Sequence, residues 1–242
     1  MSRVTTQTRK LLGRRALLVG AAATLTAGCM GAGSGPRTVT YAGPPPEAAR
    51  AQQRNAEFAH MYRAIHDEPY PIPAVDVSGV ETRFLRQSVP YDGPESAGTI
   101  VVDPNSRFLF YVMENGEAMR YGVGVGREGF GWSGEATVGR KARWPTWTPP
   151  SSMIEREPQL ARYADGMDPG PMNPLGARAL YLYENGRDTL YRLHGTNEPW
   201  SIGQAMSSGC IRLFNQDIID LYGRTATGTP VVVRPHGPSA EA

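Results

Sequence analysis

Residues 99–117 read TIVVDPNSRFLFYVMENGE, and this stretch decides the fold class. Two runs rich in β-branched and aromatic residues, 99–103 and 107–112, are separated by a Pro-Asn turn. The Asn-Gly pair at 115–116 is a strong signal for a hairpin turn, so a third strand is expected over 118–125. The stretch therefore predicts antiparallel strands joined by tight turns.

The same pattern returns further along the chain. Residues 179–183 and 189–194 flank a second Asn-Gly turn, and 231–233 form a last apolar run. One clear helix is expected over 217–222, and Asn215 or the residues just after it are candidate caps for it. Short strands without βαβ alternation predict a mainly β fold: an antiparallel sandwich or barrel-like domain with one or two short helices.

The composition divides the chain into five segments. Residues 47–66 have few helix breakers, so an N-terminal helix is expected before the β domain. Its apolar stripe consists of Phe58, Met61, Tyr62 and Ile65. In chain order we expect a signal peptide over 1–28, a flexible tether over 29–46, the N-terminal helix and a wrapping extension over 47–97, the β domain over 98–234 and a C-terminal tail over 235–242.

Residues 1–28 have the pattern of an export signal. A basic start is followed by an apolar run of about ten residues, too short for a membrane span, which needs about 20. The small residues at 26–28 precede Cys29 as in a lipobox, where Cys29 would be acylated. Arg14-Arg15 resembles a twin-arginine signal, so the general and twin-arginine routes both stay open. We expect an exported, periplasmic protein with a lipid anchor in a membrane of the bacterial envelope.

The charge balance argues against a nucleic-acid partner. The whole chain has 25 Lys and Arg and 23 Asp and Glu. Residues 1–28 hold five of the basic residues and no acid, so their removal leaves 20 against 23, a net charge near −3. Nucleic-acid binding needs a clustered basic face, and none is indicated.

Cys210 is the candidate nucleophile. It lies in the segment SSGCIRL, residues 207–213, sixteen positions after His194. The chain has one other cysteine, Cys29, which belongs to the export signal, and a single thiol beside a Gly with a His available is typical of a catalytic cysteine. His194 is the expected acid and base, which takes the thiol proton and returns it to a leaving amine.

Neighbouring residues are candidates for supporting roles. The amides of Gly209 and Cys210 are expected to stabilise an oxyanion, because Gly allows close approach of the backbone. The carbonyl of Gly195, or a nearby side chain, is expected to orient the imidazole. Further hydrogen-bonding candidates are Ser207 and Ser208.

Three residues near the two motifs are candidates for substrate binding. Arg212 lies two positions after Cys210 and either binds a substrate carboxylate or forms an ion pair with the helix at Asp217. Asn197 and Trp200 lie between the motifs. Residues 127–176 are expected to form one long loop with further tryptophans and many prolines, which favours a lid or groove wall, with core packing as the alternative.

No cofactor or metal site is predicted. The segment 124–129 matches G-x-G-x-x-G, but the residues that follow, FGWSG, cannot begin the helix that a dinucleotide fingerprint requires. One His and one Cys are too few for structural zinc. The spacing of Asp165, Asp168 and Asn173 fits no calcium loop.

Residues 98–234 resemble the catalytic domain of the L,D-transpeptidases, the YkuD-like family of cell-wall enzymes. The resemblance rests on His-Gly-Thr-Asn at 194–197, on SSGCIRL at 207–213, and on the opening strand pair with the glycine-rich segment 121–139. Many members have a His where this chain has Ser208, so this chain lacks that second His.

The resemblance implies acyl transfer on peptidoglycan stem peptides without a cofactor. Cys210 would attack the carbonyl at the L-centre of residue three of a tetrapeptide, release D-Ala and form a thioester. An amine of another stem then gives a 3–3 cross-link, and a lysine of an envelope protein gives wall anchoring. Two alternatives stay open: a carboxypeptidase or hydrolase with the same Cys–His site, and a non-catalytic wall-binding lipoprotein.

Overall fold

The computed structural model describes residues 47–126, 132–207 and 209–236, which all lie in the unit that begins at Pro45. The predicted leader, tether and most of the C-terminal tail lie outside these residues. None of the described helices combines the length and hydropathy that a membrane span requires.

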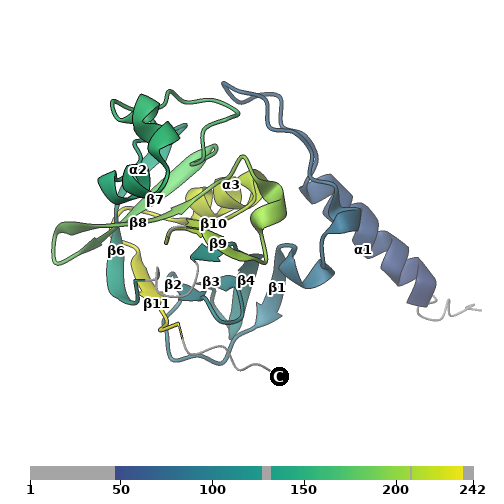
Figure 1. Cartoon of the computed structure of the whole chain (residues 1–242). Coiled ribbons are helices and arrows are strands. Elements are labelled where there is room, and N and C mark those ends of the chain that lie inside the picture. The colour runs from purple at the N-terminus through teal and green to yellow at the C-terminus, as the bar shows by residue number, and fades with distance from the viewer. Residues whose placement is uncertain (1–46, 127–131, 208, 237–242) are drawn as a thin grey trace, which may run out of the picture. The chain divides into compact units, whose positions relative to one another are not determined.

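A nine-stranded sheet forms the framework, in the order β1-β4-β3-β2-β11-β6-β7-β8-β10 (Figure 1). A second sheet pairs β5 (Val125–Gly126) with β9 (Ala205–Ser207). The predicted mainly β fold with few short helices is confirmed. The nine strands are β1 (Gln87–Pro90), β2 (Ile100–Asp103), β3 (Phe108–Val112), β4 (Glu117–Gly122), β6 (Gly134–Arg143), β7 (Arg178–Glu184), β8 (Arg187–His194), β10 (Ile211–Arg212) and β11 (Pro230–Val233).

Both predicted Asn-Gly turns are present. Asn115 and Gly116 have φ of 62° and 73°, and Asn185 and Gly186 have φ of 48° and 75°. This left-handed backbone is what a tight hairpin turn requires, and Asn and Gly adopt it at the lowest cost. The turns therefore fix the β3–β4 and β7–β8 hairpins from local sequence alone.

Three strand pairs are parallel, which the sequence did not predict. They are β2 with β11, β8 with β10, and β5 with β9. Parallel neighbours require a crossover connection, and here they join segments far apart in the chain. The β8–β10 pair matters most, because it brings the two sequence motifs side by side.

The main core lies between the strands of the large sheet and α3 (Asn215–Arg224). Ile218 and Leu221 of α3 are fully buried among side chains of β2, β7, β8 and β11. Figure 1 shows α3 near the centre of the molecule. The predicted helix at 217–222 is thus confirmed and is longer at both ends.

The interpretation of 127–176 as one long loop was wrong. Residues 134–143 form β6, which pairs with β11 on one side and β7 on the other. Its only buried side chains are Ala136 and Val138, so the segment lacks a strong strand pattern. The short helices α2 (Ser151–Arg156) and η3 (Pro158–Tyr163) follow it.

The N-terminal extension packs onto the β domain. The helix α1 (Glu47–Met61) ends five residues earlier than predicted, and two short turns follow, η1 (Val77–Gly79) and η2 (Thr82–Phe84). Phe58, Tyr62 and Phe84 form an apolar cluster with Phe214, just before α3. The extension therefore contacts the helix that follows the candidate nucleophile.

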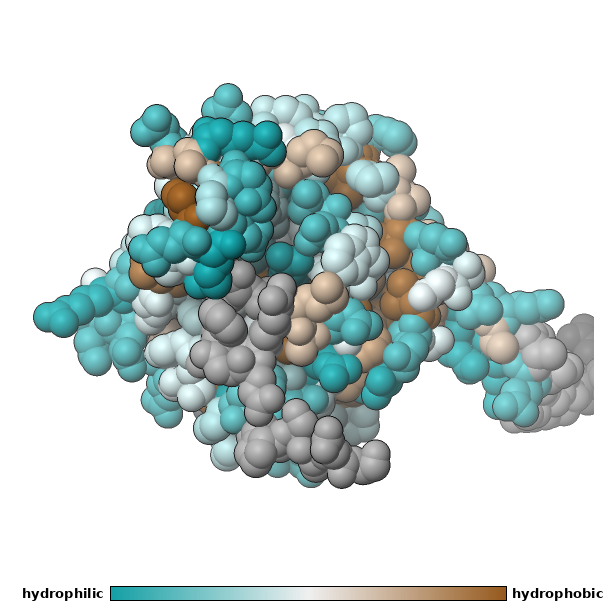
Figure 2. Space-filling view, in the orientation of Figure 1, coloured by the Kyte–Doolittle hydropathy of each residue, from teal (hydrophilic) through white to brown (hydrophobic). Residues whose placement is uncertain are grey.

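Exposed hydrophobic side chains are scattered. The face shown in Figure 2 is mostly hydrophilic, with hydrophobic residues in small separate groups. The most exposed large hydrophobic residues among those described are Met172, Leu190, Trp200 and Met206.

Candidate active site

The edge formed by β8 and β10 brings the two motifs together. His194 is the last residue of β8, and its register partner in β10 is Arg212. The Leu213 N–H donates to the His194 carbonyl at 2.8 Å. Cys210 directly precedes β10, and continuing the register by one residue places it opposite Arg192.

Strand alternation assigns these side chains to one face. Paired residues of parallel strands face the same side of a sheet, and residues two apart along a strand do so too. Arg192 and His194 of β8 thus share a face with Arg212 and, two positions before it, Cys210. Leu193 and Ile211 lie on the opposite face, in the core.

The thiol of Cys210 is half-buried against β8. Its Sγ lies 3.8 Å from the Leu190 carbonyl oxygen, which accepts a bond from the thiol. Burial raises the pKa of the Cys210 thiol above its usual value. The backbone N–H of Arg192 and the charges of Arg192 and Arg212 act in the opposite direction, because they stabilise the thiolate.

His194 is buried and held by backbone. Its Nδ1 lies 2.6 Å from the Gly195 carbonyl oxygen, which can only accept, so Nδ1 carries the proton and Nε2 is left as the base. This is the orienting contact that the sequence suggested for Gly195. Burial, with the nearby charge of Arg212, lowers the pKa of His194 to about 3, so the resting imidazole is neutral at pH 7.

Arg212 forms an ion pair, but its partner is Glu198 rather than α3. The Arg212 Nη1 and Glu198 Oε2 are 2.7 Å apart. Asn197 donates to the Met172 carbonyl at 3.2 Å, and Trp200 is exposed in the short turn η4 (Pro199–Ser201). The three substrate-binding candidates therefore come from one loop and the strand beside it.

The oxyanion candidates are placed only in part. Gly209 is buried with φ of 130°, a backbone that favours glycine. Ser208 and the side chain of Ser207 lie outside the described residues.

Asn215 has a role that the sequence did not reveal. Its Oδ1 accepts from Ala177 N at 2.9 Å, and its Nδ2 donates to Thr196 O at 2.9 Å. The helix cap is Phe214, without a side-chain bond, so the prediction of a capping Asn215 was wrong. The amide instead clamps the loop after His194 to the start of β7, a long-range contact with no local signal.

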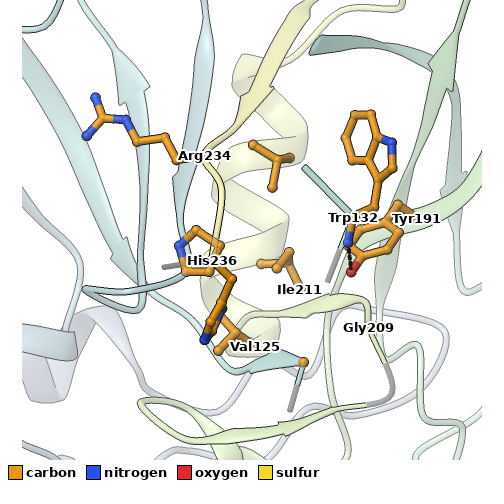
Figure 3. A pocket seen from close by; sticks show the side chains of 10 residues that line it. Val125, Trp132, Tyr191, Gly209, Ile211, Arg234 and His236 are labelled. Atoms are coloured by element: carbon orange, nitrogen blue, oxygen red, sulfur yellow. Dashed lines mark hydrogen bonds between the residues drawn. The ribbon is translucent and has the colours of Figure 1, made fainter. Parts of the chain in front are cut away.

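The tryptophans of 127–176 pack against other aromatic rings, and Trp132 and Trp144 also line pockets. Trp144 is buried, contacts Tyr70 and donates to Glu68 Oε2 at 2.8 Å. Figure 3 shows Trp132 against Tyr191, whose hydroxyl accepts from the Trp132 backbone N–H. The pocket there also borders Gly209 and Ile211, and at about 10 Å³ it has room for one water at most. It is too small to receive a peptide.

A larger cavity of about 270 Å³ borders the loop that follows His194. The extension contributes Ile72 and Pro73 to its wall, and the loop contributes Thr196 and Asn197. Its wall also includes Asn215. The extension therefore shapes the surroundings of the site, although sequence reasoning gave it no role.

A buried polar network joins the extension to α3. The Tyr62 hydroxyl donates to Asp217 Oδ2 at 2.9 Å and accepts from Arg86 N at 2.6 Å. The Arg86 Nη1 lies 3.2 Å from Asp220 Oδ1. Burial raises the pKa of Asp217 to about 7. Within the described ranges, no group of three or more His, Cys, Asp or Glu is arranged to hold a metal ion.

Comparison with known proteins identifies relatives of the β domain. The L,D-transpeptidase catalytic domain family, YkuD, matches residues 97–233, more than half of the chain. The probable L,D-transpeptidase ErfK/SrfK of Escherichia coli K12 is 35% identical over 141 residues, which are 56% of this chain and 43% of that protein. The probable L,D-transpeptidase YbiS of the same strain is 34% identical over 139 residues, 55% of this chain and 43% of that protein. The chain thus spans less than half the length of these two relatives.

Solved structures include similar chains. A crystal structure of a probable carnitine operon oxidoreductase from Brucella melitensis is 46% identical and covers 66% of this chain and 99% of that chain, with a TM-score of 0.45. An L,D-transpeptidase from Mycobacterium smegmatis is 20% identical and covers 57% of this chain and 58% of that chain, with a TM-score of 0.41.

Proposed function

This chain belongs to the family of L,D-transpeptidase catalytic domains, and we propose that it is a cysteine-dependent acyltransferase acting on peptidoglycan stem peptides. The observation that carries the proposal is the parallel pairing of β8 and β10. It places β8, which ends at His194, beside β10, which begins directly after Cys210. Strand alternation then assigns the side chains of Cys210 and His194 to the same face of the sheet. A nucleophile and a base on adjacent strands are what acyl transfer requires.

The first step transfers the acyl group to sulfur. The Cys210 sulfur attacks the carbonyl carbon at the L-centre of residue three, and His194 Nε2 receives the thiol proton. The amides of Gly209 and Cys210 are the donors proposed for the oxyanion, and loss of one such donor costs about 100- to 1000-fold in rate. As the tetrahedral intermediate collapses, the C–N bond breaks and His194 returns the proton to the leaving D-Ala amine.

The second step transfers the acyl group to an acceptor. An acceptor amine attacks the thioester carbon, gives its proton to His194, and displaces the Cys210 sulfur, which regains a proton. A neutral imidazole suits both steps, because it must accept a proton before it can donate one. An amine of a second stem gives a 3–3 cross-link, and a lysine of an envelope protein gives an anchored protein.

Water is the competing acceptor. Hydrolysis of the same thioester gives a tripeptide stem, so a carboxypeptidase would use the same residues. The Glu198–Arg212 pair at the edge of the site fits recognition of a charged peptide, with Arg212 exchanging its acid for a substrate carboxylate. We therefore favour stem peptides as substrate in both cases.

The place of action is proposed from the leader. Export through the segment 1–28 and acylation at Cys29 would anchor the domain to an envelope membrane by the tether that follows. Palmitate labelling of wild-type and Cys29→Ser chains in cells tests this, and equal labelling of both would contradict it.

The activity is tested with purified full-length protein and a disaccharide-tetrapeptide. We expect release of D-Ala and a cross-linked dimer from the wild type and from Cys29→Ala, and neither product from Cys210→Ala. Tripeptide without dimer would identify the hydrolase. The proposal would be contradicted if folded Cys210→Ala formed these products. It would also be contradicted if the wild type formed no product with any of the amine acceptors supplied.

A further inference from the structure

Strand β8 carries a bulge beside the candidate nucleophile. Tyr183 pairs with Asp188 and Tyr181 with Arg192, so between these pairs one residue of β7 is opposed by three of β8. Within the bulge, Leu190 has φ of 63°, an unusual backbone for a bulky residue, and its side chain is 68% exposed. Bulges of this kind redirect backbone groups and are common next to active sites.

The redirected backbone contacts the Cys210 sulfur. The Leu190 carbonyl accepts from the thiol at 3.8 Å. The Arg192 N–H bonds to the same sulfur and favours its ionised form. The bulge therefore offers an acceptor for the protonated state of Cys210 and a donor for the thiolate.

The guanidinium of Arg192 is held in place by neighbouring residues of β7 and β8. Its Nη1 and Nη2 bind the two carboxylate oxygens of Asp188 at 2.8 and 3.0 Å. It also lies over the Tyr181 ring, 4.4 Å from the ring centre. Two-point binding and stacking restrict the side chain, so its charge stays at one place on the face that carries Cys210.

We propose that Arg192 is the residue that stabilises the Cys210 thiolate, with its backbone N–H as hydrogen-bond donor and its guanidinium as a fixed positive charge. The inference rests on the proposed function in taking Cys210 as the nucleophile. Arg192 acts through Cys210, so it is a positioning residue for the reaction rather than a proton carrier.

The neighbouring imidazole does not supply this charge in the resting state. His194 is buried, and the charges of Arg212 and Arg192 further disfavour its protonated form. An arginine keeps its charge throughout the pH range of the reaction. The negative charge that develops on the sulfur as the thiol loses its proton is therefore balanced by guanidinium, and His194 stays neutral and ready to accept that proton.

Other groups on β8 and β10 also act on the sulfur. Asp188 opposes thiolate formation, because its negative charge repels the negative charge of the ionised sulfur. Burial raises the pKa of Tyr191 to about 12, so that hydroxyl stays neutral. The charged and titratable groups of the two strands near Cys210 are Asp188, Tyr191, Arg192 and His194 of β8 and Arg212 of β10.

Alkylation by iodoacetamide measures the thiolate without substrate. The sulfur forms a bond to the methylene carbon, iodide leaves, and the thiol proton goes to solvent. Because the reagent carries no carboxylate, a loss of substrate binding has no effect on this rate. The pH dependence is measured on the full-length protein, with modification at Cys210 followed by peptide mass so that Cys29 is counted separately.

Removing the guanidinium should slow alkylation. For Arg192→Gln we expect the rate at pH 7 to fall about three- to tenfold, with the pH midpoint shifted upward, because one pKa unit is a factor of ten in the equilibrium. Arg192→Lys should recover part of the loss. The matched control is Arg140→Gln, since Arg140 is exposed and stacks on the same Tyr181 ring at 3.5 Å, and its profile should equal that of the wild type.

Asp188→Asn gives a prediction of opposite sign. Asn keeps an acceptor for Arg192 and for Leu190 N, which donates to Asp188 at 2.8 Å, but removes the opposing charge, so alkylation at pH 7 should become faster. Unchanged midpoints in Arg192→Gln and Asp188→Asn would overturn the proposal. If the pH midpoints of alkylation shift but the protein shows no acyl transfer, only the proposed function is contradicted. If Arg192→Gln has a normal midpoint and a raised KM for the stem peptide, Arg192 is assigned to substrate binding instead.

Discussion

At the β8–β10 edge two arginines each face one carboxylate, whereas at the junction of α3 and the extension one arginine faces two. The pairs at the edge, Arg192 with Asp188 and Arg212 with Glu198, are partly exposed. At the junction Arg86 lies between Asp217 and Asp220, and Asp217 is fully buried. Each arginine at the edge is thus matched by one carboxylate, whereas the junction has one carboxylate more than its single arginine can balance.

Both regions thus contain arginine–carboxylate pairs, but these pairs have different effects. At the edge, the charges of Arg192 and Arg212 favour a thiolate on Cys210 and oppose the burial that raises the pKa of its thiol. At the junction, burial raises the pKa of Asp217 to about 7, so one carboxyl is protonated over much of the acid range. We infer that charges at the edge set reactivity, while those at the junction set the stability with which the extension docks.

The strongest way to separate the two regions is His194→Gln. The variant removes the proton carrier, so acyl transfer should fall about 100- to 10,000-fold. The iodoacetamide profile of Cys210 should stay close to wild type, because the imidazole is neutral in the resting state. A midpoint shift as large as that of Arg192→Gln would show that His194 supplies the charge after all.

Tyr62→Ala should break the junction and spare the edge. Tyr62 is fully buried, packs against Phe214 with ring centres 5.4 Å apart and donates to Asp217. Its removal should lower the free energy of unfolding in urea by about 3–5 kcal/mol, the range for large aromatic truncations.

Tyr62→Phe is the matched variant for that experiment. It keeps the ring and removes the hydroxyl, so it should cost about 1–3 kcal/mol by leaving Asp217 and the Arg86 N–H short of a partner. If truncation to Ala costs no more than the change to Phe, the apolar packing of the extension onto α3 is not what stabilises it.

Asp217→Asn tests the raised pKa through stability. The Asp217 carboxyl holds its proton up to about pH 7 in the folded protein and loses it near pH 4 in the unfolded chain. The contribution of this group to wild-type stability is therefore greatest below about pH 4 and falls as the pH rises to 7. The stability of Asp217→Asn relative to wild type should therefore increase over that window, by at most about 1.4 kcal/mol per pH unit, and level off above it.

The control for this pH series is Asp67→Asn. Asp67 is exposed on the same extension, so its replacement removes one negative charge without touching the junction. The stability difference between Asp67→Asn and wild type should stay flat over the same window. A flat difference for Asp217→Asn as well would contradict the buried-carboxyl account.

Local chemistry explains which elements the sequence could predict. The Asn-Gly turns fix the β3–β4 and β7–β8 hairpins, because few other pairs adopt that backbone. In contrast, β6 has two buried side chains and is a strand only because β11 and β7 flank it. The docking of Tyr62 on Asp217, 155 positions apart, has no local signal at all.

The candidate site divides in the same way. Cys210 and His194 stand out by residue type and motif, and the Gly195 carbonyl contact follows from the chain itself. Arg192 and Asn215 could not be selected, because their roles come from a bulge and from a clamp between distant loops. Local sequence points to the proposed reacting groups, whereas tertiary structure determines which residues surround them.

The most direct measurement is the intact mass of the full-length protein mixed with a tetrapeptide stem and quenched in acid. The account predicts a species heavier by the tripeptide acyl group, with the added mass on the peptide that contains Cys210, and its loss in Cys210→Ala. An acyl group on any other residue, or none formed while D-Ala is released, would contradict it.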